Sequence, residues 1–384
     1  MRGLKFIWIG GLPLNSYKDL FIGIDDVAYF YTGAECPSLK GHVEAFTRYA
    51  EDKSKGEEGR ARASQMEVQL RWHLATMIRA KEHEIALAGN ASEAINHLID
   101  AMPIPEGSNI VLNDLEYPSV IFPWLSLQKR KNIELRIIPS HQGEISIEDF
   151  EKHIDANTYL VVVSHVSYLN GFRHDLKQLR ALTRDHDALL FVDATQSLGV
   201  VDVDSQYFDM MVASSYKWLL GPHGLGVIYV SEELLPALSP KRVGWRSVPT
   251  IFYDKRFETF EFREDARKFE VGFNNYPAIY ALHYSTNLLM EIGIENIERH
   301  VLSLGERLLE KLHEQGWNVL SPVEEKKRSG NYSIAVENGE AIMHALEKEQ
   351  IKVWGGDGRV RMSIHFFNTI DEIEHLTERL KTIS

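Results

Sequence analysis

Residues 189–230 read LLFVDATQSLGVVDVDSQYFDMMVASSYKWLLGPHGLGVIYV, and this stretch decides the fold class. It contains two apolar runs of strand length, at 189–192 and 210–213. Asp193 follows the first run directly, and Lys217 lies shortly after the second. In an α/β sheet, functional groups gather at the carboxyl ends of the strands. We therefore expect Asp193 and Lys217 to face one crevice.

A buried lysine on such a turn has a lowered amine pKa, because desolvation disfavours its charged form. Its neutral amine can form a Schiff base with an aldehyde. An acid facing it suits pyridoxal 5'-phosphate (PLP), whose ring withdraws electrons best when its nitrogen is protonated. For an isolated Asp–Lys pair, a structural salt bridge is the commoner explanation. The surrounding residues must therefore distinguish a PLP site from a structural salt bridge.

Those residues form three motifs: Asp-Ala-Thr-Gln at 193–196, Ser-Ser-Tyr-Lys at 214–217 and Gly-Pro-His-Gly-Leu-Gly at 221–226. Together they resemble the fold-type I PLP enzymes of the class V aminotransferase family, which includes cysteine desulfurases, selenocysteine lyases, kynureninases and isopenicillin N epimerases. The resemblance extends from about residue 25 to the C-terminus. It implies an α/β fold, with a large, mostly parallel sheet domain and a smaller α+β domain.

The resemblance also implies roles for the residues in these motifs. Asp193 is expected to pair with the pyridinium nitrogen of PLP, and Gln196 with its phenolic oxygen. Ser214 and Tyr216 are expected to contact the phosphate, and Lys217 to carry the cofactor.

A further phosphate-binding candidate lies earlier in the chain. The short apolar run 84–88 leads into Gly-Asn-Ala-Ser-Glu at 89–93, where a helix begins. Such a turn presents free N–H groups and the positive end of the helix dipole, which bind phosphate. A plain N-cap with a capping acid explains the same residues equally well. By the family resemblance, Ala91 and Ser92 bind the phosphate.

Tyr117 follows the next predicted strand, residues 109–113. The family places an aromatic or histidine ring there, stacked on the pyridine, so Tyr117 is a candidate catalytic and cofactor-binding residue. A buried structural tyrosine is the alternative. After a further strand at 159–163, either Tyr168 or Asn170 can replace the family asparagine near the phenolic oxygen. His165 fits a structural and a catalytic role equally well.

The segment at 269–277 resembles the family segment that reaches across a dimer to the partner's cofactor phosphate. Phe273 stands where the family has threonine, so Asn274 and Asn275 are the candidate side chains, and Asn275 is the expected contact. The resemblance thus implies a homodimer with active sites at the interface. A surface loop without a cofactor role is the alternative.

We expect a large PLP-binding domain at residues 20–284 and a smaller α+β domain formed by residues 1–19 and 285–384. In the smaller domain, Arg361 matches the family arginine that binds the substrate carboxylate, and a guanidinium fork suits that geometry. An arginine on a strand surface is the alternative. Gly33 and Ala34 match the N-terminal segment that approaches the substrate in relatives.

The connection before this arginine, residues 353–358, has no cysteine, whereas cysteine desulfurases of the family carry their nucleophile there. We therefore expect aminotransferase chemistry on an amino acid, in which Lys217 removes the Cα proton from an external aldimine. A C–S lyase or an amino-acid epimerase is the alternative. A catalytically silent PLP-fold binding protein is a further hypothesis, which the intact Asp193, Gln196 and Lys217 disfavour.

Composition bears on the partners of the protein, its compartment and its association with a membrane. A net charge of −13 disfavours a nucleic-acid partner. The single cysteine, Cys36, excludes an intrachain disulfide and indicates a reducing compartment. A small buried thiol is its expected state. The N-terminal apolar run at residues 6–14 is too short to span a membrane. We expect a cytoplasmic enzyme without a metal or a membrane partner.

Overall fold

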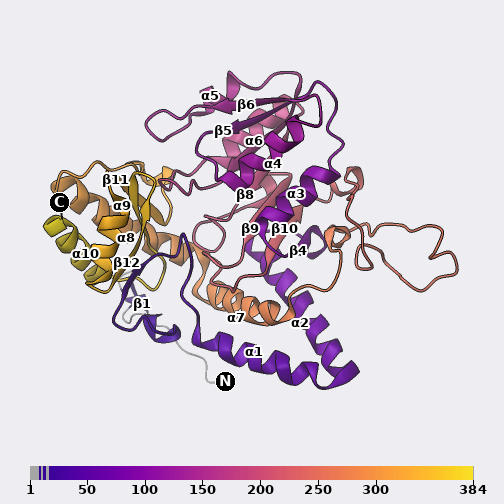
Figure 1. The fold of residues 1–384 in the computed structure, drawn as a ribbon, viewed down its shortest axis with the longest axis horizontal. Helices are drawn as coiled ribbons and strands as arrows, with labels where there is room; N and C mark the ends of the chain where they lie inside the picture. The colour runs from indigo at the N-terminus through magenta and orange to yellow at the C-terminus, as the bar shows by residue number, and fades with distance from the viewer. Residues whose placement is uncertain (1–7, 10–11, 14–16, 384) are drawn as a thin grey trace.

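The computed structural model describes all of the 384 residues except 1–7, 10–11, 14–16 and 384. The chain forms two parts, each built around one β-sheet (Figure 1). The larger part holds a seven-stranded sheet, and the smaller part, which includes the C-terminus, holds a four-stranded sheet. The predicted α/β fold is confirmed.

The larger sheet is mostly parallel. Its strand order is β4-β10-β9-β8-β7-β5-β6, and β10 alone runs antiparallel to its neighbours. The carboxyl ends of the other strands therefore share one edge. The strands are β4 (Ile85–Ala88), β5 (Asn109–Asn113), β6 (Glu134–Ile138), β7 (Thr158–Ser164), β8 (Leu189–Asp193), β9 (Met210–Ser214) and β10 (Gly226–Val230).

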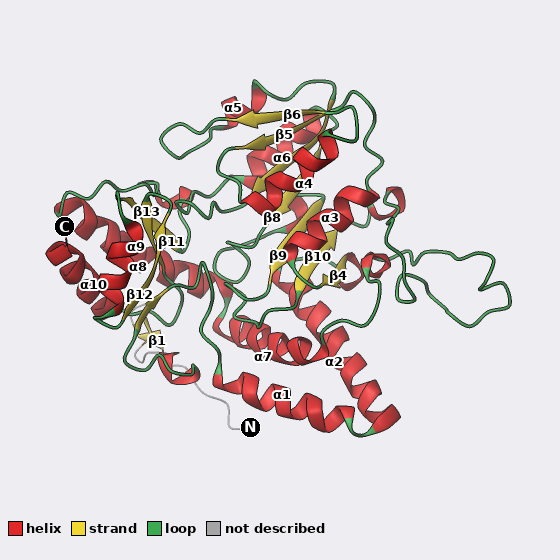
Figure 2. Ribbon diagram, in the orientation of Figure 1, coloured by secondary structure: helices red, strands yellow, loops and turns green. Residues whose placement is uncertain are grey.

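Helices cover both faces of this sheet (Figure 2). The helices of the chain are α1 (Lys40–Lys53), α2 (Gly56–Met77), α3 (Ala91–Ala101), α4 (Pro118–Gln128), α5 (Ile147–Glu151), α6 (Leu176–Asp185), α7 (Tyr276–Ile292), α8 (Ile294–Glu314), α9 (Gly339–Glu347) and α10 (Ile370–Ile383).

Side chains that alternate along each strand enter two core layers. Ile110 and Leu112 of β5 pack on the side of α3 and α4. Val111, between them, packs on the side of α2, α6 and α7, in a core that continues into the smaller part. A sheet buried on both faces needs strands that are apolar throughout, and this explains the uninterrupted runs in the sequence.

The smaller sheet has the order β11-β13-β12-β3. Its strands are β3 (Ala28–Phe30), β11 (Asn331–Ala335), β12 (Ile351–Gly356) and β13 (Arg359–Ser363). Strand β3 pairs in parallel with β12, so residues 28–30 lie in the smaller sheet although they fall within the predicted large domain. The division at residues 20 and 284 stays a prediction. Of the predicted segment 1–19, most residues lie outside the described part, and β1 (Trp8–Ile9) pairs with β2 (Leu12–Pro13).

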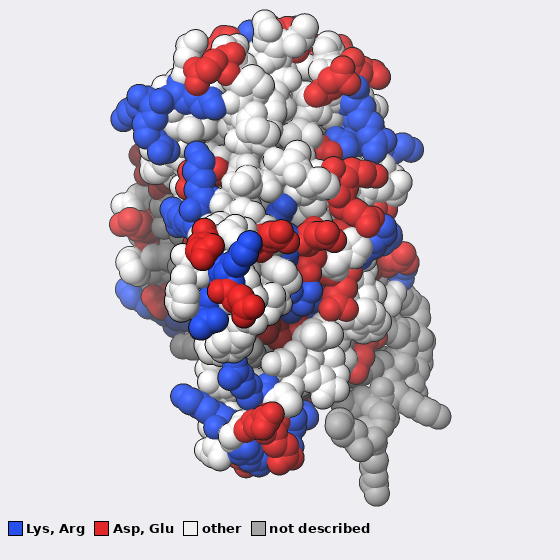
Figure 3. Space-filling model, turned by 90° about the vertical axis from the view of Figure 1, so that its right-hand side faces the viewer, with Lys and Arg blue, Asp and Glu red and all other residues white. Residues whose placement is uncertain are grey.

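Strands β12 and β13 form a tight hairpin, and Asp357 and Gly358 adopt positive φ values of 49° and 70° at its turn. The connection before Arg361 is therefore a hairpin turn. On the face shown in Figure 3, basic and acidic side chains are interspersed. Among the described residues, no helix has the length and apolar character needed to cross a membrane.

Candidate active site

The site lies at the carboxyl edge of the larger sheet. Strands β4, β5, β7, β8 and β9 all end there, and one pocket collects residues at or after each strand end. The pocket is lined by Ala91, Ser92, Tyr117, Ser119, Ser164, Val166, Tyr168, Asp193, Thr195, Gln196, Ser214, Tyr216 and Lys217. Every cofactor-binding residue predicted from the sequence lies in this set except Asn275. Asp193 and Lys217 thus face one crevice.

Lys217 lies on the turn after β9 and is 9% exposed. Its amine pKa is lowered to about 8, mainly by burial and then by the charge of Arg361, whereas Asp193 opposes the shift. Its Nζ lies 5.6 Å from the centroid of the Tyr117 ring. An appreciable fraction of this amine is therefore neutral and nucleophilic near neutral pH.

The turn that carries Lys217 is supported by the smaller part of the chain. Trp218, which is fully buried, donates from Nε1 to Gln196 Oε1 at 2.8 Å, and its carbonyl oxygen lies 3.1 Å from His365 Nε2. Gly199 has a φ of 104°, and a Cβ there would lie 2.4 Å from the Trp218 carbonyl oxygen. Only glycine permits this approach. The position of Lys217 therefore depends on packing between both parts.

Asp193 ends β8 and is 7% exposed. Its Oδ1 accepts from the Thr195 N–H at 2.8 Å, and Thr195 Oγ1 accepts from the Ser214 N–H at 3.1 Å. Burial raises the pKa of Asp193, while the Thr195 hydrogen bonds and the charge of Lys217 oppose the rise. Sequence reasoning missed Thr195, although an Asp that bonds the backbone two residues on is a common turn signal.

The N-terminus of α3 fits both alternatives that the sequence left open. Asn90 Oδ1 accepts from the Glu93 N–H at 2.9 Å, and Glu93 Oε2 accepts from the Gly89 N–H at 2.9 Å, so the helix is capped. The amides of Ala91 and Ser92 come before the first intrahelical hydrogen bond, and both residues line the pocket. The capped turn can therefore still bind a phosphate.

Tyrosine rings border the pocket. The Tyr117 ring meets the Tyr168 ring edge-on at 4.9 Å between centroids, and the Tyr216 ring stacks on His223 at 4.2 Å. Tyr117 is 45% exposed, so the alternative of a buried structural tyrosine is wrong. An exposed ring beside Lys217 is placed to stack on a planar cofactor.

Glu116 is a buried carboxyl that sequence reasoning missed. It accepts from the Ser164 N–H at 2.7 Å, from Ser164 Oγ at 2.5 Å and from Asn113 Nδ2 at 2.7 Å. These bonds tie the end of β5 to the end of β7. Burial raises the pKa of Glu116 to about 7, with a smaller contribution from Asp193. No local pattern marks the residue, because its partners come from two strands.

The Gln196 side chain joins the two parts of the chain. Its Nε2 donates to Gly33 O at 3.0 Å, and its Oε1 accepts from Asn331 Nδ2 at 3.0 Å as well as from Trp218. One Nε2 hydrogen remains for the phenolic oxygen of a cofactor. Gly33 and Ala34 thus lie in a turn held directly against Gln196.

Tyr168 lines the pocket and Asn170 does not. Asn170 Nδ2 donates to Gly143 O at 2.7 Å, and its Oδ1 accepts from the Phe172 N–H at 3.0 Å. Both ends of that side chain are therefore engaged in structural bonds.

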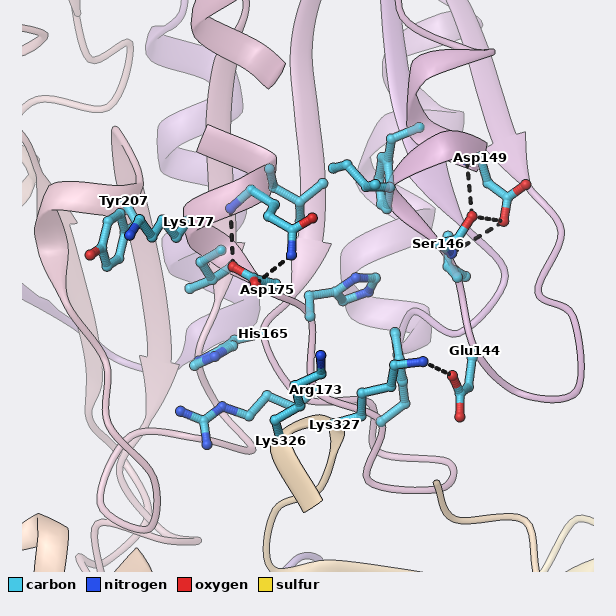
Figure 4. A pocket seen from close by; sticks show the side chains of 18 of the residues that line it. Glu144, Ser146, Asp149, His165, Arg173, Asp175, Lys177, Tyr207, Lys326 and Lys327 are labelled. Atoms are coloured by element: carbon cyan, nitrogen blue, oxygen red, sulfur yellow. Dashed lines mark hydrogen bonds and ion pairs between the residues drawn. The ribbon is translucent and has the colours of Figure 1, made fainter. Parts of the chain in front are cut away.

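His165 faces away from the pocket. Ser164 lines the pocket, whereas His165 lines a separate cavity of about 1040 Å³ (Figure 4). Charged groups of that cavity pair with one another, such as Lys327 with Glu144 at 2.6 Å. The backbone N–H of His165 donates to Asp193 O at 2.9 Å. This geometry supports the structural role for His165.

Arg361 on β13 places a charge of the smaller part beside the pocket, although the residue does not line it. It is 4% exposed, its Nη1 donates to Tyr168 O at 2.8 Å, and its Nε is buried without a hydrogen-bond partner. Burial lowers the pKa of Arg361 to about 10, and the charge of Arg359 adds to the effect. No carboxylate of the described chain lies within ion-pair distance of it. A buried and uncompensated guanidinium is costly unless an anion binds.

Four predicted site residues do not line this pocket: Gly33, Ala34, Asn275 and Arg361. Cys36 does not line it either. Asn275 Oδ1 caps α7 by accepting from the Ala278 N–H at 3.3 Å, and its contact with a partner's cofactor stays a prediction. Cys36 Sγ lies 3.6 Å from Gly221 O. Burial raises the pKa of the Cys36 thiol to about 12. A protonated thiol is a poor nucleophile.

The donor set of the pocket fits PLP. A lysine of lowered pKa, a buried carboxyl facing it, an exposed ring and free helix amides are the groups that an aldehyde, a pyridine and a phosphate require. This fold and this site are those of a PLP-dependent enzyme.

Comparison with known proteins identifies the family. The family model for class-V aminotransferases matches residues 39–376. The chain belongs to that family.

Individual relatives are distant but match over most of their length. An uncharacterized aminotransferase, YcbU of Bacillus subtilis, is 28% identical over 80% of this chain and 82% of its own. A probable cysteine desulfurase of Pyrococcus abyssi is 28% identical over 94% of this chain and 95% of its own. The structure of an apo cysteine desulfurase from Thermococcus onnurineus superposes with a TM-score of 0.89, at 26% identity, over 97% of this chain and 99% of its own. The chain is a PLP-dependent enzyme of fold type I.

Proposed function

We propose that the chain is an aminotransferase for an α-amino acid, with Lys217 as its base and Arg361 as its carboxylate-binding residue. The buried guanidinium of Arg361 carries the proposal. It has no carboxylate partner in the described residues, and it lies close enough to Lys217 to lower the pKa of that amine. A substrate carboxylate on Arg361 would compensate the charge and bring the Cα atom toward Lys217.

The roles of the residues follow from their positions. When bound, PLP supplies an electron sink for negative charge at the substrate Cα. Asp193 would hold a proton at the ring nitrogen, and Tyr117 would support the ring face. Arg361 orients the substrate, and the Lys217 amine removes the Cα proton, for which a pKa of about 8 is well suited. Ala91, Ser92, Ser214 and Tyr216, which line the pocket, would hold the phosphate.

The point to which the proton returns decides the reaction. The Lys217 base could serve three outcomes: transamination, epimerisation with the proton returned to Cα, or loss of a β-substituent in a lyase. The one cysteine of the chain, Cys36, has a protonated thiol, which supports transamination over desulfuration by a nucleophilic cysteine. A C–S lyase that needs no cysteine is the second candidate, and the names of the desulfurase relatives favour it.

We also propose a cytoplasmic homodimer with active sites at the interface, in which Asn275 contacts the partner's cofactor phosphate. Several large apolar side chains are exposed in the single chain, and burying any of them in a dimer would be favourable: Trp72 is 53% exposed, Phe257 86% and Phe273 60%. The single cysteine supports a reducing compartment.

The test is incubation of the PLP-loaded protein with a panel of amino acids, with 2-oxoglutarate or pyruvate as acceptor. We expect a keto acid that forms only when acceptor is present, and Lys217→Ala should abolish it. Sulfide from cystine or cysteine without an acceptor would assign the lyase, and inverted stereochemistry would assign the epimerase. If no amino acid reacted or changed the absorption of the bound cofactor, the enzyme proposal would be wrong.

A further inference from the structure

A second arginine accompanies Arg361 on β13. Arg359 lies two residues earlier, and alternate residues of a strand share one face. Both side chains contact the same indole: the Cζ atoms of Arg359 and Arg361 lie 4.8 Å and 5.3 Å from the centroid of the Trp354 ring. Both arginines are 4% exposed. The strand therefore presents two buried guanidinium groups side by side.

Arg359 also touches the wall of the pocket. Its Cζ lies 5.3 Å from the centroid of the Tyr168 ring. Tyr168 lines the pocket, and its backbone oxygen accepts from Arg361 Nη1. The two arginines thus hold the same residue, one by its ring and the other by its carbonyl group. The Tyr168 side chain therefore stands between Arg359 and the pocket.

The charge of Arg359 is compensated by a carboxylate that lies at the protein surface. Its Nη1 donates to Asp357 Oδ2 at 2.6 Å, and Asp357 is the one carboxylate found at ion-pair distance in the described chain. The Asp357 side chain is 72% exposed at the hairpin turn, whereas that of Arg359 is 5% exposed. The Nε of Arg359 is buried without a hydrogen-bond partner. Only the acid of this pair is solvated, so Asp357 can turn to water and leave the buried guanidinium to a better-placed anion.

The geometry points to Arg359 as a second anion-binding residue of the substrate site, which selects amino acids with an anionic group on the side chain. This inference rests on the proposed function, because it takes the α-carboxylate to bind Arg361. Asp357 holds the guanidinium of Arg359 in the free enzyme and yields it to the distal anion of the substrate. The rings of Trp354 and Tyr168 fix the plane of the guanidinium for that exchange.

The test uses carboxylic acids without an amino group, which bind the PLP-loaded protein without reacting. Succinate, glutarate and adipate are each compared by calorimetry with the monocarboxylate of equal chain length: butyrate, valerate and hexanoate. We expect at least one dicarboxylate to bind about tenfold more tightly than its partner, as a charge-assisted hydrogen bond provides. An equal affinity within every pair would overturn the inference.

Two variants separate binding from structure. Arg359→Gln should bring the ratio of dicarboxylate to monocarboxylate affinity close to one. Asp357→Asn should raise the dicarboxylate affinity, because Arg359 is then released, whereas loss of a purely structural ion pair would not. If Arg359→Gln weakened both series by one factor, or if Asp357→Asn weakened dicarboxylate binding, the inference would be wrong. Asp357→Asn decides the matter even if Arg359→Gln does not fold.

Steady-state kinetics test whether the same preference for a second anion holds for substrates. The ratio of kcat/KM for aspartate over asparagine, or for glutamate over glutamine, should exceed one in the wild type and fall in Arg359→Gln. A different result would count against the proposed function: monocarboxylates would either not bind the wild type, or bind the wild type and Arg361→Met equally well. Failure of this inference alone leaves monocarboxylate binding dependent on Arg361 without any preference for a second anion.

Discussion

Replacing Arg361 with methionine should stabilise the substrate-free enzyme while it damages substrate binding. The pKa of Arg361 is lowered from 12.5 to about 10, mainly by burial, and at about 1.4 kcal/mol per unit this is a cost of roughly 3 kcal/mol for the charged form. Loss of the hydrogen bond to Tyr168 O destabilises the variant by about 1 kcal/mol, which offsets part of this gain. The net gain of roughly 2 kcal/mol should raise Tm by a few degrees.

Substrate binding should change in the opposite direction. A charge-assisted hydrogen bond to a carboxylate contributes about 1.5–3 kcal/mol, so KM for an amino acid should rise roughly 10- to 100-fold in Arg361→Met. The matched control is binding of the corresponding amine, which lacks the carboxylate and should bind both proteins alike. Thermal unfolding without substrate and steady-state kinetics measure the two effects. A lowered Tm together with an unchanged KM would contradict both roles given to Arg361.

Three further expectations concern titratable groups. The rate of PLP uptake by the cofactor-free protein should rise with pH and level off above about 8, because the neutral Lys217 amine attacks the aldehyde; a flat profile between pH 6 and 9 would contradict this. Cys36→Ser should retain activity, since burial raises the thiol pKa to about 12, and a loss of several orders of magnitude in kcat would reveal a nucleophilic cysteine. The pKa of Glu116 is raised to about 7, so its stabilising effect is present below the ordinary carboxyl pKa and is lost as pH rises through 7. The free energy of unfolding of Glu116→Gln, measured in urea, should therefore be more favourable relative to the wild type at pH 8 than at pH 5. An equal difference at both pH values would contradict this.

The sequence predicted the larger sheet well because its strands are local signals. Uninterrupted apolar runs ending in polar residues are what a sheet buried on both faces requires, and β8 and β9 carry Asp193 and the Lys217 turn where the pattern placed them. The same rule explains why the pocket residues after five different strands meet in space. Their gathering follows from parallel strand direction, which the alternation of strands and helices already indicates.

The features that sequence reasoning missed depend on contacts between distant segments. Strand β3 joins the smaller sheet through pairing with β12, more than 300 residues later in the chain, and its short length gives no periodic signal. Glu116 becomes special only because β5 and β7 end side by side. Arg359 looks like an ordinary strand residue until Trp354 and Tyr168 are seen to enclose it.

The proposed chemistry depends on a covalent link between the Lys217 amine and the cofactor. The most direct measurement is reduction of the PLP-loaded protein with borohydride, followed by peptide mass spectrometry. We expect one reduced pyridoxyl group per chain, attached to Nζ of Lys217, and no trapped cofactor in Lys217→Ala. A pyridoxyl group on another lysine, or none after saturation with PLP, would contradict it.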